Sequence, residues 1–526
     1  MIRRRMRSPI EAALYVSRFA VCAASVLVFA SCLHAQLGGG APSQTTPASQ
    51  LPLSGRTAQN GSVAAVQNPV PGATASVDTL NPSVQVQGPY TGSANSTAVM
   101  PFSGKLGFRE AIQRGLAYNL GAVGLAQAVR QAQGISHAAR SALLPNLNGS
   151  VTESDQTENL RALGFHFTVP IPGFSIPTIV GPFNYIDARV QVTQNVLDLS
   201  AINNYRSSAE VLRSNQLSAL NARDLVVLAV GGTYLQVLAA QARMASARAQ
   251  LDTANAVYQQ TSQQNGVGLV ARIDVDRSQV QALTEQQRLV SLQNDFAKQK
   301  INLARLIGLP PTDQYELSDD IPFAAAPPLA VDEALKQAFE QRSDLKAAQA
   351  QVSAAEKTHS AARAERIPSF SFNANYGAIG TNPNQAKATY TVAGTVRVPI
   401  WQGGRAGADI EQSEAALAQR RAEAEDLKSE IESEVRGAYL DLQAATSQVD
   451  LSQRNLQVSR ETLDLTRQRF EAGVTDSVEV VQSEQTLASA ELDYIDSVFA
   501  HNVAKLSLAR AVGSAAGSLP QFLPVR

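Results

Sequence analysis

The chain has 526 residues, a formal net charge of −1 and 17% charged residues. This near-neutral balance gives no electrostatic basis for binding nucleic acid, so no nucleic-acid partner is expected. The two cysteines, Cys22 and Cys32, lie near the N-terminus, which excludes a disulfide framework in the rest of the chain. A chain of this length usually forms several domains.

The N-terminus has the pattern of an export signal. A basic start precedes a short apolar run and then small residues, so residues 1–35 are predicted to be a signal peptide. Two ends fit this pattern: cleavage after Ala35, or a lipoprotein-type cleavage that leaves a lipidated Cys32 as the first residue. Phe29 is unusual for a lipoprotein site, and this favours cleavage after Ala35.

Residues 36–100 are rich in Gly, Pro, Ser, Thr, Gln and Ala. Such a segment buries too little apolar surface to offset the entropy of ordering, so it is predicted to be a disordered leader. Beyond the signal no run of about 20 apolar residues occurs, and the nearest, 225–240, is interrupted by Gly231 and Gly232. A mature chain that crosses a membrane is therefore not expected to use apolar helices.

The remainder of the chain contains an internal sequence repeat. The sequence LGFREAI, starting at Leu106, is similar to LAVDEAL, starting at Leu329. We predict an internal duplication, with one structural repeat at 101–328, a second at 329–515 and a C-terminal tail at 516–526.

Each repeat has the same predicted order of two helices, a strand pair and two long helices. In the first repeat these are expected at about 106–118, 121–143, 146–197, 200–264 and 275–308. In the second they are expected at about 331–341, 344–366, 369–401, 405–471 and 477–512. Helices of about 65 residues are roughly 100 Å long and need partners along their length. A coiled coil without a channel has the same periodicity.

The strands alternate strictly. Phe370 and Phe372 alternate with Ser369 and Ser371, which is typical of a transmembrane β-barrel strand, although a half-buried strand of a soluble sheet has the same pattern. The export signal and the aromatic residues at the strand ends, such as Trp401, favour the membrane. Four strands do not close a barrel, since the smallest have about eight, and lipid does not tolerate an open edge. Several copies of the chain are therefore expected to join.

Two short phrases, at 267–275 and 472–480, interrupt the long helical stretches. Each has Gly, an apolar residue, a short polar link and then an apolar residue, an acid and Val. Together with the duplication and the proline junctions at Pro145 and Pro368, these phrases resemble the TolC-like outer-membrane efflux proteins. The resemblance covers about residues 100–515.

The resemblance implies an α+β membrane protein that assembles as a homotrimer. Each chain contributes four strands to a twelve-stranded β-barrel in outer-membrane lipid, continued by a periplasmic α-helical barrel with a belt of shorter helices. It further implies that a periplasmic adaptor protein docks at the two turns and that an inner-membrane pump supplies the energy.

The resemblance also implies a gate at the turns. By position Asp274 and Glu479 match the acids that hold such pores shut, while Gln482 replaces a further acid and Thr475 stands where some members have arginine. Alternatively, the two acids are first-turn charges favoured by the helix dipole. The tip residues expected to meet the adaptor are Gly268, Leu269, Val270, Gly473, Val474 and Thr475.

No phosphate loop, nucleophile elbow or HExxH motif occurs, and the histidines show no metal-ligand spacing, so neither an enzyme nor a cofactor or metal site is expected. The sequence is interpreted as the outer-membrane exit duct of a tripartite efflux system for small molecules. A duct for type I polypeptide secretion uses the same architecture. The alternative of another class is a non-conducting periplasmic coiled-coil scaffold with a lipid anchor.

Overall fold

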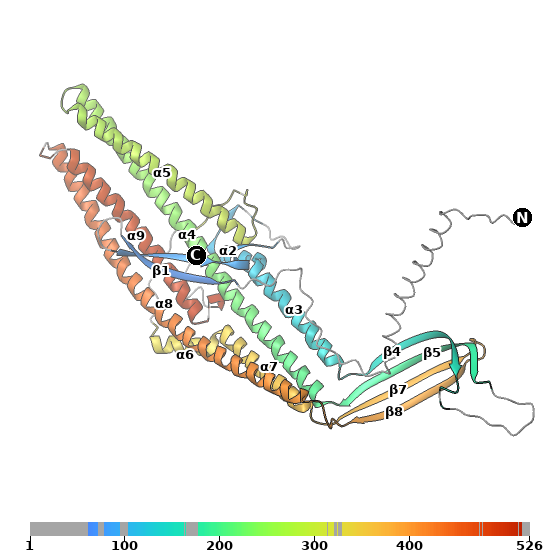
Figure 1. Ribbon diagram of the computed structural model, residues 1–526. Coiled ribbons are helices and arrows are strands. Elements are labelled where there is room, and N and C mark those ends of the chain that lie inside the picture. Colours follow the sequence, from blue (N-terminus) through green and yellow to red (C-terminus); the bar gives the residue numbers. More distant parts are fainter. Residues whose placement is uncertain are drawn as a thin grey trace, which may run out of the picture. The chain divides into compact units, whose positions relative to one another are not determined.

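The computed structural model describes most of the chain beyond residue 60 (Figure 1). The described residues are 61–71, 78–94, 102, 104–162, 164, 177–312, 314–319, 323–324, 329–472, 474–475, 477–513 and 515–517. All of them lie in one compact unit, Asn60–Arg526. The predicted signal peptide, Cys32 and Gly473 lie outside the described residues.

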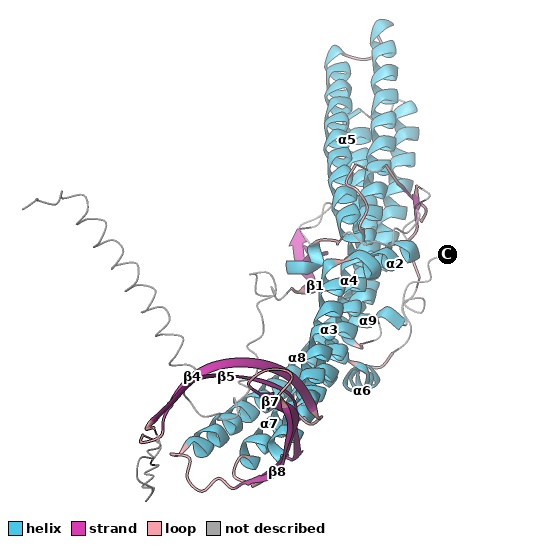
Figure 2. Cartoon of the chain, turned by 90° about the vertical axis from the view of Figure 1, so that its right-hand side faces the viewer, coloured by secondary structure: helices cyan, strands magenta, loops and turns pink. Residues whose placement is uncertain are grey.

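The largest sheet has four antiparallel strands. They are β4 (Asn146–Asn159), β5 (Ile179–Leu197), β7 (Ser369–Gly380) and β8 (Lys387–Arg397), in the order β4-β5-β7-β8. The sheet is strongly curved (Figure 2). Within the described part of the chain, β4 and β8 each have one neighbouring strand, so each leaves one edge open.

The strand register places apolar residues on one face of this sheet. One row across all four strands consists of Leu147, Val192, Ala374 and Val392. The adjacent residues form a polar row on the opposite face, Asn148, Gln191, Asn375 and Thr391. The apolar face is not covered: Val392 is 63% exposed in the single chain. The alternation read from the sequence therefore produces a two-sided sheet whose apolar side has no packing partner in the described chain.

Two long helical hairpins follow the strands. The first pairs α4 (Leu199–Gly266) with α5 (Arg272–Ile307), and the second pairs α8 (Arg405–Glu471) with α9 (Ser477–Ala511). These bounds lie within three residues of the ranges expected from the sequence. α4 begins directly after β5, where the side chain of Asp198 accepts a hydrogen bond from Ala201 N at 2.9 Å and so caps the helix.

Four shorter helices precede the strand pairs. They are α2 (Phe108–Tyr118) and α3 (Leu120–Ser141), then α6 (Val331–Gln341) and α7 (Ser343–Ala364). α3 and α7 pack against α4, and α7 also packs against α8. The order of two short helices, two strands and two long helices therefore occurs twice along the described chain.

The hydrophobic core gathers around the middle of α4, where Tyr234 is fully buried. Across the described residues α4 holds the one stretch long and apolar enough to cross a membrane, but 83% of that stretch is buried in the fold, as expected of a core helix. A parallel pair, β3 (Lys105–Leu106) and β6 (Glu316–Leu317), lies at the edge of this core. The hydroxyl of Tyr234 donates to Leu106 O at 3.0 Å.

The expectation of a disordered leader at 36–100 is wrong for its described part. The strands β1 (Val63–Pro71) and β2 (Asp78–Val86) form an antiparallel hairpin, and a short 3-10 helix, η2 (Gly88–Thr91), follows it. Val63 and Tyr90 are buried in the core, and the side chain of Asn119 donates to Tyr90 O at 2.8 Å. A few apolar residues are thus sufficient to order this polar segment, because the folded helices offer an apolar surface on which they are buried.

Candidate functional site

The first turn joins α4 to α5. Gly268 has a φ of +78°, which favours glycine, and its N–H donates to Asn265 O at 2.9 Å. Leu269 N donates to Gln264 O at 2.9 Å, and the Asn265 side chain donates to Val270 O at 2.8 Å. The first two bonds satisfy carbonyls in the last turn of α4, and the side chain of Leu269 is 75% exposed.

The second turn joins α8 to α9 in the same way. Val474 N donates to Arg469 O at 2.9 Å, which repeats the bond from Leu269 N to the carbonyl five residues earlier. Val474 is also exposed, at 68%. Both hairpins therefore end in a tight turn with exposed apolar side chains, among them Leu269 in the first and Val474 in the second.

Asp274 lies in the first turn of α5. Its Oδ1 is 3.7 Å from Arg277 Nη1, and the neighbouring Asp276 pairs with Arg272 at 3.1 Å. Both acids therefore have an arginine partner on their own helix. The first-turn position of Asp274 suits the helix dipole.

Glu479 lies in the first turn of α9 and pairs across the turn. Its Oε1 accepts a hydrogen bond from Arg469 Nη1 at 2.7 Å, and Thr475 Oγ1 donates to its Oε2. Thr475 thus contacts the acid even though it replaces an arginine. Sequence reasoning missed Arg469, which supplies the positive charge from the preceding helix.

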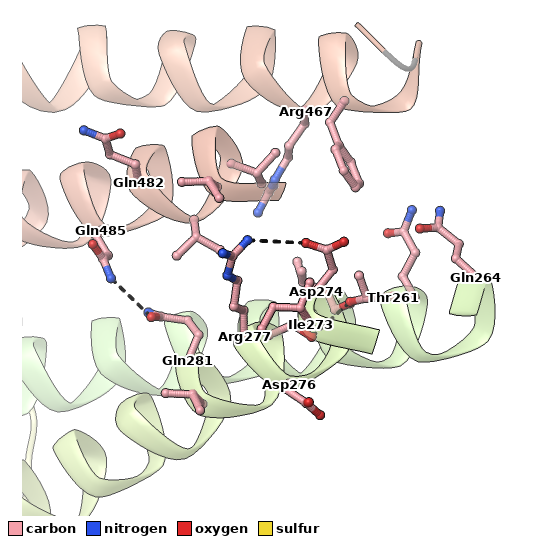
Figure 3. Close-up of a pocket in the computed structure, with 18 residues that line it drawn as sticks. Thr261, Gln264, Ile273, Asp274, Asp276, Arg277, Gln281, Arg467, Gln482 and Gln485 are labelled. Carbon is pink, nitrogen blue, oxygen red and sulfur yellow. Dashed lines mark hydrogen bonds and ion pairs between the residues drawn. The ribbon is translucent and has the colours of Figure 1, made fainter. Parts of the chain in front are cut away.

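A cavity of about 780 Å³ lies between the ends of the two hairpins (Figure 3). From the first hairpin it is lined by Val257, Gln260, Thr261, Gln264, Ile273, Asp274, Asp276, Arg277, Ser278, Val280 and Gln281. From the second it is lined by Arg467, Phe470, Val478, Val480, Val481, Gln482 and Gln485. The structure therefore brings Asp274 and Gln482 to one cavity, whereas Glu479 lines a separate groove with Arg469 and Val474.

Hydrogen bonds tie the hairpins internally and to each other. Thr261 Oγ1 donates to Ser278 Oγ at 3.1 Å in the first hairpin, and Ser483 Oγ donates to Thr466 Oγ1 at 3.2 Å in the second. Between the hairpins, the Gln485 amide donates to Gln281 Oε1 at 3.2 Å (Figure 3). The pair of Thr261 and Ser278 in the first hairpin thus corresponds to the pair of Thr466 and Ser483 in the second.

α9 also carries ionisable groups in the core, away from its turn. Burial lowers the pKa of His501 to about 4, and the charge on Lys505 adds to this effect. Burial likewise lowers the pKa of Lys505 to about 8, although its Nζ donates to Ala324 O at 2.9 Å. Both side chains are fully buried. They make the core sensitive to pH.

Comparison with known proteins decides the family. The model of the family described as "Outer membrane efflux protein" matches residues 123–309 and 334–514, more than half of the chain. The chain belongs to the outer membrane efflux protein family. As a member, it is an outer-membrane channel of an efflux system and a component of an efflux pump, and the family is one of channels rather than enzymes.

Individual members of the outer membrane efflux protein family are also similar to this chain in sequence. The pyoverdine export outer membrane protein OpmQ of Pseudomonas aeruginosa is 25% identical over 399 residues, covering 73% of this chain and 80% of OpmQ. The outer membrane protein TolC of Escherichia coli is 21% identical over 346 residues, covering 63% of this chain and 70% of TolC. The predicted family, the outer-membrane location and the efflux-duct function are thus confirmed.

Solved structures of this family have the same fold. The CmeC outer membrane channel of Campylobacter jejuni superimposes with a TM-score of 0.67 at 14% identity, covering 78% of this chain and 86% of CmeC. The open state of the Neisseria gonorrhoeae MtrE channel gives 0.66 at 16% identity, covering 80% of this chain and 95% of MtrE. The predicted combination of long helices with a small number of strands is confirmed.

Proposed function

We propose that three copies of this chain form one exit duct through the outer membrane and the periplasm. The duct passively conducts small molecules that a periplasmic adaptor protein and an inner-membrane pump deliver to it. The observation that carries this proposal is the four-stranded sheet, which has two open edges and an exposed apolar face.

An exposed apolar face and open edges both need partners. Lipid suits the face that contains Val392 and Tyr390, and the polar row with Asn375 then faces a water-filled lumen. The curved sheet is too small to close on itself, so β8 of one copy pairs with β4 of the next. Three copies give a twelve-stranded barrel, with the aromatic Trp401 at the end of the spanning segment.

The long helices also present apolar stripes without a partner in the described chain. On α5, Val280 and Leu283 are exposed, and on α8 so are Leu451, Val458 and Leu465. The α8 residues recur every seven positions, which is the spacing of a coiled-coil seam. Packing the α8 stripe of one copy against α5 of the next closes the helices into a periplasmic cylinder.

The two hairpins support the proposed internal duplication. The turn hydrogen bonds at Leu269 and Val474, and the hydroxyl pairs at Ser278 and Ser483, occupy equivalent places. The family model also matches the chain in two segments. The repeats are assigned to 101–328 and 329–515.

The hairpin ends are proposed to be the periplasmic gate and the docking site of the adaptor. Asp274 and Gln482 line the cavity between the hairpins, and Glu479 fixes the second turn through Arg469. Displacing one hairpin against the other breaks the hydrogen bond between the side-chain amides of Gln485 and Gln281. The docking surface consists of Gly268, Leu269, Val270, Gly473, Val474 and Thr475.

A small-molecule cargo is favoured over a secreted polypeptide by the similarity to OpmQ, whose name assigns it to pyoverdine export. Delivery of both cargoes uses the same duct, so the distinction depends on the pump. Export assays in a deletion strain test it: complementation restores resistance to small toxic molecules if the proposal is correct. Restored secretion of a polypeptide without restored resistance contradicts it.

Native mass spectrometry of the purified mature protein tests the assembly. We expect one species at three times the chain mass. A monomer or a dimer as the largest species under conditions that keep the protein folded contradicts the trimer. The same spectrum decides the predicted processing, because a lipidated Cys32 and an unmodified start at Gln36 differ in mass.

A further inference from the structure

A second, smaller cavity adjoins the cavity between the hairpin ends. It has a volume of about 140 Å³, and Gln281 and Arg467 line both spaces. It lies on the side away from the turns, between residues of all four long helices. The two cavities together form a wide apolar chamber with a narrow polar extension.

The narrow extension is rich in carboxylates. Glu285, Glu484 and Glu491 line it, together with Gln250 and Arg467. The wide chamber adds Asp274, Asp276 and Arg277. Five carboxylates and two guanidinium groups line the two spaces, while Arg272, Arg288 and Arg460 pair with Asp276, Glu285 and Glu491 from outside this lining. The lining itself carries more negative than positive charge, which suits a cation.

Glu285 is the most deeply buried of these acids. It is 6% exposed, and its Oε1 accepts a hydrogen bond from Gln281 Nε2 at 3.0 Å. Its Oε2 is buried and accepts no hydrogen bond from any described residue, while Arg288 Nη1 lies 3.7 Å away. A buried carboxylate oxygen without a hydrogen bond is costly, and Arg288 is too distant to donate one, so this oxygen can accept from a further donor.

Glu484 faces the same space from the other hairpin. It lies on α9 and pairs with Arg467 at 3.0 Å, with a side chain that is largely buried. A ligand that reaches both Glu285 and Glu484 therefore contacts both hairpins. It also joins the hydrogen-bonded series that runs from Gln485 through Gln281 to Glu285.

The wide chamber has apolar walls on both sides. Val257 and Val280 contribute from the first hairpin, and Phe470 and Val480 contribute from the second. Its volume lies within the range of about 300–1,000 Å³ that is usual for small-molecule sites. Figure 3 shows that Gln281 and Gln485 lie at the same end of this chamber, and Gln281 also lines the narrow extension.

We propose that this composite cavity is a binding site for an amphipathic organic cation, with its ammonium group beside Glu285 and Glu484 and its apolar body in the chamber. The bound cation holds the two hairpins in the arrangement seen here and so lowers the conductance of the duct. The effect on conductance rests on the proposed gate, whereas the binding itself does not.

Isothermal titration of the full-length mature protein in lipid nanodiscs tests the site, with 4-phenylbutylammonium as the probe. The matched controls are 4-phenylbutanol and 4-phenylbutyrate, which have the same apolar body without the positive charge. We expect the ammonium to bind at least tenfold more tightly than either control. Equal affinities of the ammonium and the alcohol overturn the proposal.

Two isosteric variants locate the charge. Glu285→Gln and Glu484→Gln are each expected to weaken binding of the ammonium about tenfold, since one charged contact is typically that large. Glu461→Gln, an exposed position on α8 outside both cavities, is the control and is expected to bind like the wild type. Unchanged affinity of the ammonium for both cavity variants overturns the proposed site. If Glu285→Gln does not fold, Glu484→Gln alone decides.

Bilayer recordings then separate the site from the gate. The ammonium is expected to reduce conductance, and Glu285→Gln is expected to abolish this effect. Simple block of the pore predicts inhibition that persists in Glu285→Gln, and this outcome contradicts the proposal. If the channel does not conduct at all, the proposed duct fails while the titration still decides the binding site.

Discussion

At the scale of single residues, the tip acids are held by arginines. Asp274 has Arg277, and Glu479 has Arg469 and Thr475. A carboxylate ring of three chains favours cations, but the adjacent guanidinium groups weaken that preference. Asp274 pairs within α5, whereas Glu479 pairs across its turn with α8.

Removing both acids is expected to favour the open duct. An exposed ion pair contributes on the order of 0.5 kcal/mol, so Asp274→Ala with Glu479→Ala, which loses two pairs in each of three copies, removes on the order of 3 kcal/mol and shifts the open-to-closed ratio by up to roughly a hundredfold. Single-channel recordings of the purified double variant measure this shift, and cells that carry it are expected to become more sensitive to large antibiotics.

The control for the gate is Asp450→Ala. Asp450 has the same type of exposed pair, with Arg454 on its own helix α8, and lies outside both cavities. The open probability of this variant is expected to match the wild type. Equal effects of the control and the double variant show a general loosening of the helices and remove the gate assignment.

His501 gives the core a defined response to acid. Its pKa is about 4 in the folded protein and about 6.5 in the unfolded chain, so the unfolded chain binds the proton more readily. Stability is therefore fully present above pH 6.5 and falls as the pH drops from 6.5 to 4, by roughly 3 kcal/mol at full effect. The linked fall in melting temperature is the measurable quantity.

His501→Leu isolates this contribution from that of the carboxylates. The variant keeps a similar apolar volume and removes the titrating ring. The melting temperature of the wild type is expected to fall more steeply than that of the variant between pH 6.5 and 4. Parallel curves for the two proteins rule out a role for His501 in the acid response.

At the scale of elements, local periodicity predicted most of what is observed. The 3.6-residue and 2-residue patterns located the long helices and the strands, because each pattern depends on neighbours in the sequence. The β1–β2 hairpin was missed, since its order depends on the surface that α4 offers to Val63 and Val84. The partner of Glu479 was missed for a similar reason: Arg469 reaches it across a turn.

The two faces of β8 predict opposite responses to a new charge. Arg in place of Val392 meets lipid and costs about 2–4 kcal/mol near the middle of the membrane. Thr391→Arg places the same charge on the polar face and is the matched control. We expect the amount of trimer in outer-membrane fractions to fall for Val392→Arg alone, and equal amounts contradict the assignment of the faces.

The docking of the β1–β2 hairpin depends on a close approach to α4. A Cβ atom added at Gly232 would lie 2.3 Å from Val84 Cγ2, whereas one added at Gly231 would lie 3.1 Å from its nearest neighbour, Leu506 Cδ1. Gly232→Ala is therefore expected to destabilise the protein by about 1–3 kcal/mol relative to Gly231→Ala, the overpacking cost of a core. The melting temperature and the rate of proteolysis within residues 61–94 measure the difference.

Equal melting temperatures of the two glycine variants contradict this prediction, because they show that the β1–β2 hairpin moves away from the added methyl group without a loss of stability. Both changes add the same methyl group to the same helix, so their helix propensities cancel. The remaining difference reports only the contact with Val84.

At the scale of the whole molecule, a single chain is incomplete. Its sheet has open edges, its apolar face is exposed, and its helices carry apolar stripes that nothing in the described chain covers. The arithmetic of strands predicted assembly from the sequence. The cavity between the hairpins was not predicted, because it arises where two segments about 200 residues apart come together.

The conductance of the purified protein in a planar lipid bilayer shows directly if the protein is a duct. We expect discrete channels of one size, with an open probability raised by Asp274→Ala with Glu479→Ala. Folded trimers that insert into the bilayer and pass no current at any voltage contradict it.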